Sequence, residues 1–585
     1  MTGLLASLLA SALLLDFRNM FYGDWNTHLW LIAYFGESIR HWHIPIVVNT
    51  NQLVGIAVPI FYAQKFYALF GMLSAFLGSA VTVRIMIFMV FLLQFLHIYR
   101  AAIKAGATDK ISICIAVMMT WAIYPLTNLY NRSDLPEFFA VAFLTCSLAS
   151  FLCVIINDGD KPASRYDMIA TGLFFVISAM THALTALFGG LFLCVLGLTA
   201  LIFCEKKRKL WLLAYSFITG LLSLLILSPW IYVLARFHDK LPIVRLITRL
   251  DGIDPGFTNI FSILSPFPLD FRSIQKGVQG VSTPYLDIQV VLPLMILIAV
   301  FIYIRLRDKN IRFCSDACQG AITVAAVGML IVTLTLSVYP AASVWFGRFF
   351  DILQFSYRLS SYINLSILVI VIILAGRMSR ANVHSQQVIN ICLAFCIGIS
   401  LSALMLKLAH GAVLSTKSTQ VDREVWAPLP FGPNRHLIEL PGTFVAAPAY
   451  TVVDGFAKDT LSGMLPTVSR NFNVFEGDRF GQVGDLTFTL PQPALVFLNV
   501  QPFPWNRIVI NGALQPQSHI IETGGYFAQE AVALIPGNYT LKVVTQVDGM
   551  WKFLNFVSWV LLLGWIALYA TTVFFRTGGR HALEK

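Results

Sequence analysis

Residues 134–156, DLPEFFAVAFLTCSLASFLCVII, decide the class of fold. Beyond the acidic side chains of Asp134 and Glu137, this stretch consists of apolar residues and small hydroxyl side chains. It therefore reaches the roughly 20 residues that a helix needs to cross the hydrocarbon core of a bilayer. Similar stretches, the first of them short, predict eleven more transmembrane helices, over residues 3–15, 82–100, 110–127, 167–185, 187–204, 210–235, 288–306, 319–339, 361–377, 386–408 and 551–575.

The composition agrees with a polytopic α-helical membrane protein. Of the 585 residues, 57% are hydrophobic and 12% are charged, whereas a soluble domain carries roughly 25% charged residues. This balance excludes a soluble enzyme and a disordered chain. The net charge of +11 comes from basic residues in short breaks between apolar stretches. That distribution predicts contact with membrane lipid and no nucleic-acid partner.

The basic residues also predict the orientation of the chain in the membrane. Residues 54–80 are apolar but interrupted by Pro59, Lys65 and Gly71. If this segment does not cross, the short loops and the tail on one side carry 18 Lys and Arg residues against three in the short loops on the other side. Because cytoplasmic loops are enriched in basic residues, we interpret 54–80 as a re-entrant or interfacial segment. Loops 16–81 and 236–287 then face outward.

The region 409–550 differs from the rest of the chain and predicts a β-sandwich on the extracytoplasmic side. It holds strand-like runs at 494–500 and 507–510, and Asn511-Gly512 is a strong hairpin signal. No cysteine lies beyond Cys396, so no disulfide framework is expected there. We therefore divide the chain into a transmembrane domain 1–408, a β-rich domain 409–550, a last transmembrane helix 551–575 and a cytoplasmic tail 576–585.

Polar residues next to the predicted outward helix ends are the candidates for chemistry, because charge at membrane depth is costly and usually functional. Asp24 and His28 are four residues apart, at the start of a predicted interfacial helix. Asp24 is either an N-cap or a catalytic base. His182 ends another helix and is either a packing residue or part of a site.

Two further clusters contain arginine. Arg132 and Glu137 flank the start of the span quoted above, and they form either a local ion pair or part of a site. Gln354 and Arg358 precede the span 361–377, where Arg358 is either an interface anchor or a ligand for phosphate. An arginine fork suits a phosphate or a carboxylate. Neither a phosphate-binding loop nor a dinucleotide fingerprint occurs, which favours a lipid-carried over a nucleotide-carried substrate.

Several motifs resemble a known family in the same order along residues 20–370. They are Gly23-Asp24 with His28; Ile44-Pro45, Asn49, Gly55 and Pro59-Ile60-Phe61-Tyr62; Tyr124 with Asn128 to Arg132 and Glu137; His182; and Gln354 to Arg358. This pattern is similar to prokaryotic membrane proteins labelled 6-pyruvoyl-tetrahydropterin synthase-related. The chain shows no zinc-binding histidine set that would support pterin chemistry. The family resembles in turn the GT-C glycosyltransferases, membrane enzymes that use polyprenyl-phosphate sugars and often end in a periplasmic domain.

The resemblance implies roles for these residues. Asp24 would match the acidic base of the GT-C enzymes, and Arg132 and Arg358 would hold the donor phosphate. Glu137 and His182 would shape the site. The chain departs from the family at Ser356, where proline is usual, and no second acid follows two residues after Asp24. We expect no cofactor, and nothing in the sequence supports a divalent metal ion.

These observations predict a GT-C-like glycosyltransferase in the bacterial inner membrane. It would move a sugar from a polyprenyl-phosphate donor to a glycan, lipid or protein acceptor of the envelope. Two alternatives stay open from the residues alone. One is a transporter or flippase of a lipid-linked saccharide, although the polar residues avoid mid-membrane positions and no repeat is visible. The other is a non-catalytic assembly protein whose β-domain carries the function.

Overall fold

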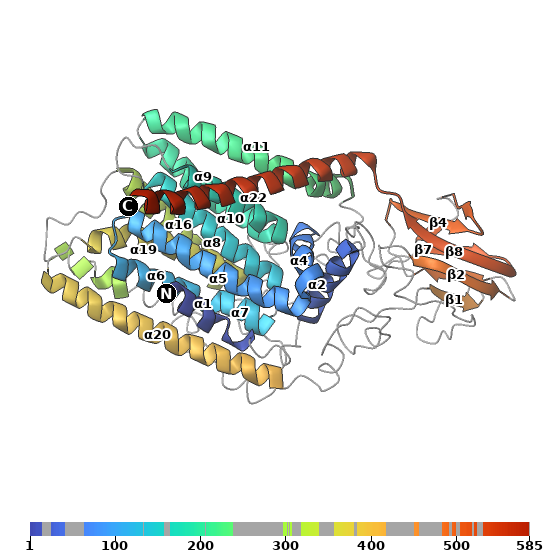
Figure 1. The fold of residues 1–585 in the computed structure, drawn as a ribbon, viewed down its shortest axis with the longest axis horizontal. Coiled ribbons are helices and arrows are strands. Elements are labelled where there is room, and N and C mark those ends of the chain that lie inside the picture. The colour runs from blue at the N-terminus through green and yellow to red at the C-terminus, as the bar shows by residue number, and fades with distance from the viewer. Residues whose placement is uncertain are drawn as a thin grey trace.

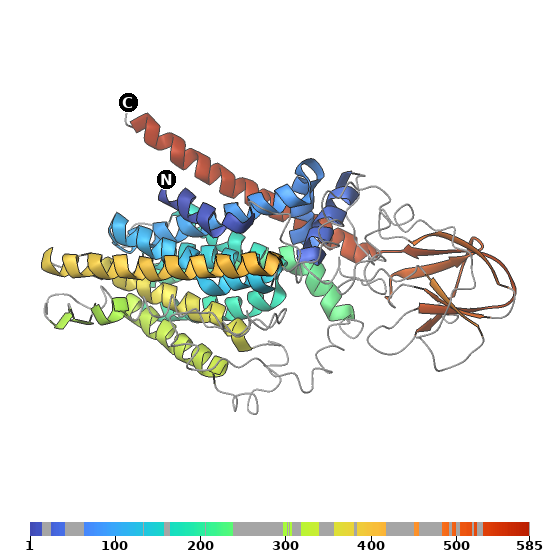
Figure 2. The same ribbon diagram turned by 90° about the horizontal axis from the view of Figure 1, so that it is seen from below.

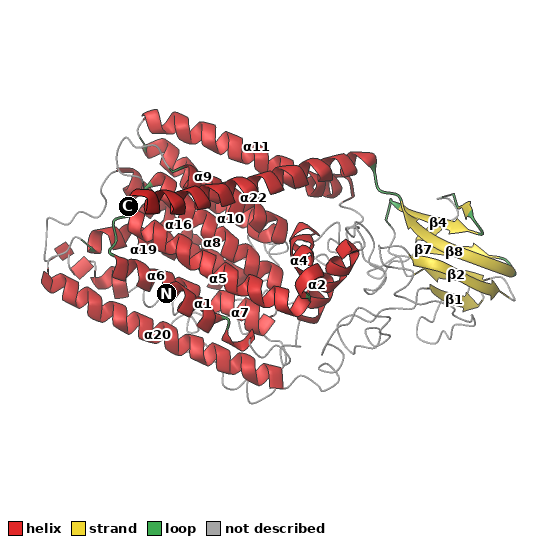
Figure 3. Cartoon of the chain, in the orientation of Figure 1, coloured by secondary structure: helices red, strands yellow, loops and turns green. Residues whose placement is uncertain are grey.

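A computed structural model describes the chain in part, and every statement below concerns the parts described: residues 1–14, 25–40, 64–132, 134–156, 164–204, 206–237, 296–300, 302–303, 305–306, 317–338, 356–379, 383–416, 450–454, 483–490, 494–498, 503–516, 520–522 and 530–583. Within them, nine helices are long and apolar enough to cross a membrane. The chain is therefore a multi-pass α-helical protein, and the strands between residues 450 and 545 form a separate group at one end of the helices (Figure 3).

The helices are α1 (Thr2–Ala10), α2 (Trp25–Arg40), α4 (Gln64–Leu77), α5 (Ser79–Lys104), α6 (Asp109–Thr120), α7 (Ile123–Thr127), the π-helix η2 (Asn128–Arg132), α8 (Leu135–Ile155), α9 (Arg165–Thr181), α10 (Ala183–Phe203), α11 (Lys206–Phe237), α16 (Ala317–Val338), the 3-10 helix η4 (Ser356–Leu359), α19 (Ser360–Met378), α20 (Val383–Thr416) and α22 (Gly549–Leu583). Figure 1 shows α20 along the lower edge of the helix bundle, and Figure 2, seen from below, brings it to the front.

Nine of the twelve predicted spans coincide with these nine long apolar helices. The boundary between 167–185 and 187–204 was predicted too late, because the extended backbone of His182 separates α9 from α10. The first predicted span contains only the nine-residue helix α1, about 14 Å long at 1.5 Å per residue. Most of 288–306 lies outside the described residues, so a total of twelve spans stays a prediction.

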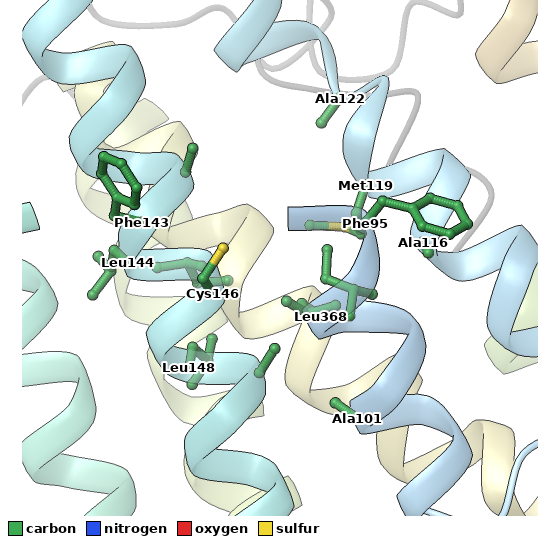
Figure 4. Close-up of a cluster of buried hydrophobic side chains, with 14 of the residues drawn as sticks. Phe95, Ala101, Ala116, Met119, Ala122, Phe143, Leu144, Cys146, Leu148 and Leu368 are labelled. Atoms are coloured by element: carbon green, nitrogen blue, oxygen red, sulfur yellow. The ribbon is translucent and has the colours of Figure 1, made fainter. Parts of the chain in front are cut away.

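The centre of the bundle is α8. Every residue of this helix is buried, and it packs against α5, α9, α10 and α19. Figure 4 shows side chains from neighbouring helices meeting there, among them Phe95 of α5, Met119 of α6, Cys146 of α8 and Leu368 of α19. In contrast, α10, α11, α16 and α22 expose many large apolar side chains. Because water would penalise such a surface, these outer helices are suited to contact with lipid.

Helices α2 and α4 pack against each other at the end of the bundle that faces the strands (Figure 1). Neither is among the nine candidate spans. The predicted re-entrant or interfacial segment 54–80 is described only from Gln64 onward, where α4 runs for 14 residues. Gly78 then adopts φ +78° and separates α4 from α5, a conformation that favours glycine.

The strands form two antiparallel sheets. One has the order β1 (Tyr450–Asp454), β3 (Ala494–Leu498), β7 (Glu530–Leu534), β6 (Ile520–Glu522); the other has the order β2 (Val483–Leu490), β8 (Gly537–Thr545), β4 (Asn506–Ile510), β5 (Ala513–Leu514). Asn511 and Gly512 join β4 to β5 with φ of 48° and 78°. Positive φ at both central residues is the property of a type I′ hairpin turn. The predicted hairpin turn is therefore confirmed.

The predicted boundary at 408 is too early, because α20 continues to Thr416. The apolar side chains that follow Ala409 extend the hydrophobic pattern of the helix. Gly411 lies within this extension, and its backbone approaches Leu13 and Tyr130 so closely that a Cβ atom would meet Leu13 at 2.6 Å. The added turns of α20 therefore pack closely against Leu13, near the start of the chain.

Candidate functional site

The start of α8 positions two carboxylates. Asp134 is the N-cap of this helix, and its Oδ1 accepts a hydrogen bond from the backbone N–H of Glu137 at 3.2 Å. Pro136 in the first turn fits here because an N–H at this position has no partner inside the helix. The local sequence therefore orients Glu137 at the mouth of the buried central helix, where the residue is 2% exposed.

Glu137 is held by three neighbours. Its Oε1 accepts hydrogen bonds from the Tyr124 hydroxyl at 2.7 Å and from Asn128 Nδ2 at 3.1 Å. Its Oε2 lies 3.1 Å from Nε of Arg358. Buried carboxylates are costly unless they are paired and hydrogen-bonded. The three contacts satisfy this requirement and hold the carboxyl group of Glu137 in a defined geometry.

The π-helix η2 explains how Asn128 reaches Glu137. It follows α7 directly, and the backbone N–H of Asp134 returns to the carbonyl of Asn128 at 2.9 Å. This bond closes a short loop that brings η2 against the first turn of α8. Single π-helical turns within α-helices are frequent at functional sites, because the wider turn re-aims side chains.

Arg358 comes from a distant part of the chain. It lies on η4, immediately before α19, and contacts both acids of the α8 start. Its Nη2 is 3.8 Å from Oδ2 of Asp134, which is too long for a hydrogen bond, whereas its Nε is 3.1 Å from Glu137. The guanidinium is therefore fixed by Glu137 and held more loosely by Asp134.

His28 approaches this cluster from α2. Its Nδ1 is 2.6 Å from the hydroxyl of Tyr67 on α4, and the two rings stack with centroids 6.2 Å apart. Burial lowers the pKa of His28 from 6.5 to about 4, while the charge of Asp134 acts in the opposite direction. The imidazole is therefore neutral at pH 7, and it lies within the electrostatic reach of Asp134.

His182 has a structural role in the described part of the chain. His182 is the N-cap of α10. Its Nδ1 accepts a hydrogen bond from the backbone N–H of Thr185 at 3.3 Å and lies 2.8 Å from the Thr185 hydroxyl. The carbonyl of Thr185 accepts at 3.4 Å from the hydroxyl of Tyr362, one turn beyond Arg358. His182 thus shapes the start of α10 beside the helix that follows Arg358.

The predicted site residues are brought together only in part. Arg358 contacts Asp134 and Glu137, and His28 lies within the electrostatic reach of Asp134, although their sequence positions are far apart. Asp24 and Gln354 lie outside the described residues. Only the backbone of Arg132 is described, within η2. Glu137 contacts Arg358, and a contact between Glu137 and Arg132 stays a prediction.

Sequence reasoning assigned no role to three residues of this cluster. Tyr124 and Asn128 belong to the motif quoted with Glu137 for the family resemblance, and their spacing of four places them on one side of a helix, but no role was given to them. Tyr67 lies in the ambiguous segment 54–80 and carries no pattern of its own. That motif is the sequence signal that points to the first two residues.

The described cluster holds two carboxylates, one guanidinium and a neutral imidazole. Such a set can hold a polar ligand by charge-assisted hydrogen bonds and can accept a proton at a carboxylate. Within the described residues, no group of three or more His, Cys, Asp or Glu side chains is arranged to hold a metal ion. The described geometry therefore supports proton transfer and anion or hydroxyl recognition.

Comparisons with known proteins add no assignment. No family model, no curated protein and no solved structure matches the chain. The candidate site thus rests on its own geometry.

Proposed function

We propose that the chain is a GT-C-like membrane glycosyltransferase. One observation supports the proposal above the others: titratable side chains from three distant segments converge at one end of an apolar helix bundle. They are His28 of α2, Asp134 and Glu137 at the start of α8, and Arg358 before α19. Polar groups that are expensive to bury beside a membrane are usually retained for function.

The position of the cluster suits a substrate carried by a lipid. The outer helices expose apolar side chains, and the cluster lies at the bundle end that faces the strands. A polyprenyl chain would lie against the apolar surface while its phosphate and sugar reach the polar end. A glycan, lipid or protein acceptor would approach from the side of the sheets. We assign this side to the extracytoplasmic space and the protein to the bacterial inner membrane.

The opposite end of the bundle supports this orientation. Arg100 and Lys104, near the end of α5, both contact Asp167 of α9, at 2.7 and 2.6 Å. Lys206 begins α11, and Arg377 lies in the last turn of α19. Basic residues concentrate at the cytoplasmic ends of spans, which favours a cytoplasmic location for this end.

In the proposed reaction, the acceptor hydroxyl attacks the anomeric carbon of the sugar. A new C–O bond forms there, and the C–O bond to the phosphate breaks, so the electron pair leaves with polyprenyl phosphate. Asp24 takes the hydroxyl proton as general base. Inversion at the anomeric carbon follows from a single displacement.

Arg132 and Arg358 are proposed to stabilise the departing phosphate. Arg358 is already paired with Glu137, so this role requires the phosphate to replace the weaker contact with Asp134. Glu137 would keep the guanidinium in place during the exchange. His28, His182 and Gln354 are proposed to complete the walls of the site.

The test compares lipid-linked and envelope glycans by mass spectrometry. Cells that lack the protein are complemented with wild type or with Asp24→Asn at equal expression. We expect wild type to restore a missing sugar and Asp24→Asn to leave it missing. Restoration by both proteins would remove the base assignment. If the deletion changes no glycan and no lipid-linked sugar, the glycosyltransferase proposal is wrong.

A further inference from the structure

Two cysteines from distant parts of the chain meet at the basic end of the bundle. Cys204 is the C-cap of α10, at the opposite end of that helix from His182, and Cys318 is the second residue of α16. Their Sγ atoms are 2.9 Å apart, although 114 positions separate the two residues in the sequence. The proposed reaction uses neither of them.

The contact between the two thiols is closer than apolar packing. Carbon atoms pack best at about 3.5–4.0 Å, and sulfur is the larger atom. The two sulfur atoms therefore point at each other and do not merely share an apolar surrounding. To form a covalent disulfide bond, they need to approach by only about 0.9 Å. The pair is thus placed for bond formation.

Both cysteines lie at the ends of candidate spans. Cys204 directly follows the span Ala183–Phe203, and Cys318 is the second residue of the span Ala317–Ser337. Each residue is 6% exposed. A position at the membrane boundary with so little exposed surface is accessible to a small water-soluble oxidant and closed to a bulky one.

Positive charge surrounds the pair. The N-terminus of α16 carries a partial positive charge, which stabilises a thiolate at Cys318. Arg377 of α19 donates from Nη2 to Oε1 of Gln319, the neighbour of Cys318, at 2.9 Å. Lys209 of α11 donates at 2.8 Å to a carbonyl in the last turn of α10. Because the thiolate is the reactive form of cysteine, these surroundings favour reaction at this pair.

The chemistry of the pair suits a disulfide better than a metal ion. A structural zinc ion is almost always held by a tetrahedral set of ligands, which two thiolates do not complete. Among the residues that the structure describes, His, Cys, Asp and Glu side chains form no group of three or more that could hold a metal. Two thiols in contact are sufficient for a disulfide bond.

We propose that Cys204 and Cys318 form a reversible disulfide bond, which a peroxide closes and a thiol reductant opens. The bond would link the end of α10 to the start of α16. The basic end of the bundle is the end that we assign to the cytoplasm, where thiols are kept reduced. The dithiol is then the resting form, and the disulfide forms under oxidative conditions. The proposal does not rest on the glycosyltransferase assignment, because it follows from the contact of the two thiols.

The reaction uses one molecule of hydrogen peroxide for each disulfide. The thiolate of Cys318 attacks one peroxide oxygen, the O–O bond breaks, and hydroxide leaves with the electron pair. The thiolate of Cys204 then attacks the sulfur of the resulting sulfenic acid, so that an S–S bond forms, the S–O bond breaks and a second hydroxide leaves. The hydroxide ions take up the protons that the thiols released. The thiols are oxidised, the peroxide is reduced, and the products are one disulfide and two water molecules.

The disulfide should also stabilise the fold. It would close a loop that spans 114 positions and contains α11. Closing a long loop removes entropy from the unfolded chain, and the effect grows with loop length. The oxidised protein should therefore unfold at a higher temperature than the reduced protein.

The experiment treats the purified, reduced full-length protein in lipid nanodiscs with hydrogen peroxide, which catalase then removes. The protein is unfolded, its remaining thiols are blocked with N-ethylmaleimide, and it is digested without reduction for mass spectrometry. We expect two of the nine cysteines to escape maleimide and to appear as a peptide pair that joins Cys204 to Cys318. Dithiothreitol should remove this pair. The unfolding temperature should rise after peroxide and return after dithiothreitol.

Three alanine variants complete the test. Cys204→Ala and Cys318→Ala each remove one sulfur, and alanine is a mild change because a thiol packs as a small apolar group. Neither variant should form the peptide pair or gain unfolding temperature with peroxide. In Cys204→Ala, the sulfenic acid of Cys318 should accumulate and be trapped by dimedone. Cys194→Ala removes an exposed thiol from α10 and should form the peptide pair as wild type does.

Two results would overturn the proposal. One is that peroxide produces no peptide pair joining Cys204 to Cys318 in wild type. The other is that Cys204 is joined instead to Cys314, which lies outside the described residues. The glycosyltransferase assignment is tested by other measurements and would survive either result.

Discussion

At the scale of single residues, the two acids at the start of α8 have different roles. Asp134 satisfies a backbone N–H of its own helix and has only a 3.8 Å contact with Arg358, whereas Glu137 accepts two hydrogen bonds and forms an ion pair with Arg358. A cap can be replaced by another good acceptor, but a buried charge pair cannot lose one partner without exposing the other to an apolar surrounding. Substitutions at the two positions should therefore behave differently.

For Asp134, the matched variants are Asn and Ala. Asparagine caps a helix about as well as aspartate, whereas alanine provides no acceptor and costs about 1 kcal/mol. We expect Asp134→Ala to lower the unfolding free energy by about that amount and Asp134→Asn to lower it by less than half. Thermal unfolding in detergent measures both. Equal losses for the two variants would mean that the charge, and not the cap, stabilises the fold.

For Glu137, the prediction concerns the pair with Arg358. Glu137→Gln and Arg358→Gln each leave a buried charge without its closest partner, and each should cost about 3 kcal/mol. Tyr124→Phe removes one hydrogen bond and should cost about 1 kcal/mol. In the double variant of Glu137 and Arg358 the loss should be smaller than the sum by about 1–3 kcal/mol. Strict additivity would show that the two side chains do not stabilise each other.

At the scale of secondary-structure elements, close helix contacts depend on particular glycines. Gly376 of α19 lies against the end of α5, and a Cβ there would be 1.8 Å from the carbonyl oxygen of Ala105. Backbone atoms cannot move aside as the end of a flexible side chain can. By contrast, no atom within 4 Å would meet a Cβ at Gly398 of α20.

These glycines provide a matched pair. We expect Gly376→Ala to separate α19 from α5 and to lower the unfolding temperature or prevent folding. Gly398→Ala should be neutral or stabilising by up to about 1 kcal/mol, because alanine is the better helix former. Thermal unfolding of the purified variants distinguishes the two. A tolerated Gly376→Ala would contradict the close packing of these helices.

The elements differ in how far their sequence predicts them. Long apolar stretches specify α5, α8 and α19 because hydrophobicity and length suffice for a span. Hydrophobicity and length do not predict the end of α9 at Thr181, since the break depends on the cap that His182 makes for α10. The sequence indicated polar residues at helix ends as candidates for a site. It did not indicate the geometry of the site, because the pairing of Glu137 with Arg358 requires α8 and α19 to pack side by side.

At the scale of the whole molecule, the account predicts that the sheets and the basic loops lie on opposite sides of the membrane. Ala513 is exposed on β5, and Lys110 is exposed near the start of α6, at the basic end of the bundle. In intact cells, Ala513→Cys should react with a membrane-impermeant maleimide and Lys110→Cys should not. The wild-type protein measures the background of its native cysteines. Labelling of Lys110→Cys alone would reverse the orientation.

The central claim is that the polar end of the bundle transfers a sugar from a lipid carrier. The most direct measurement incubates the purified full-length protein with a panel of polyprenyl-phosphate sugars and with envelope extract as acceptor. Mass spectrometry then follows each donor and its product. We predict that wild type consumes one donor and releases polyprenyl phosphate, and that Asp24→Asn consumes none. If no donor is consumed while extracts of wild-type cells contain the corresponding product, the account is contradicted.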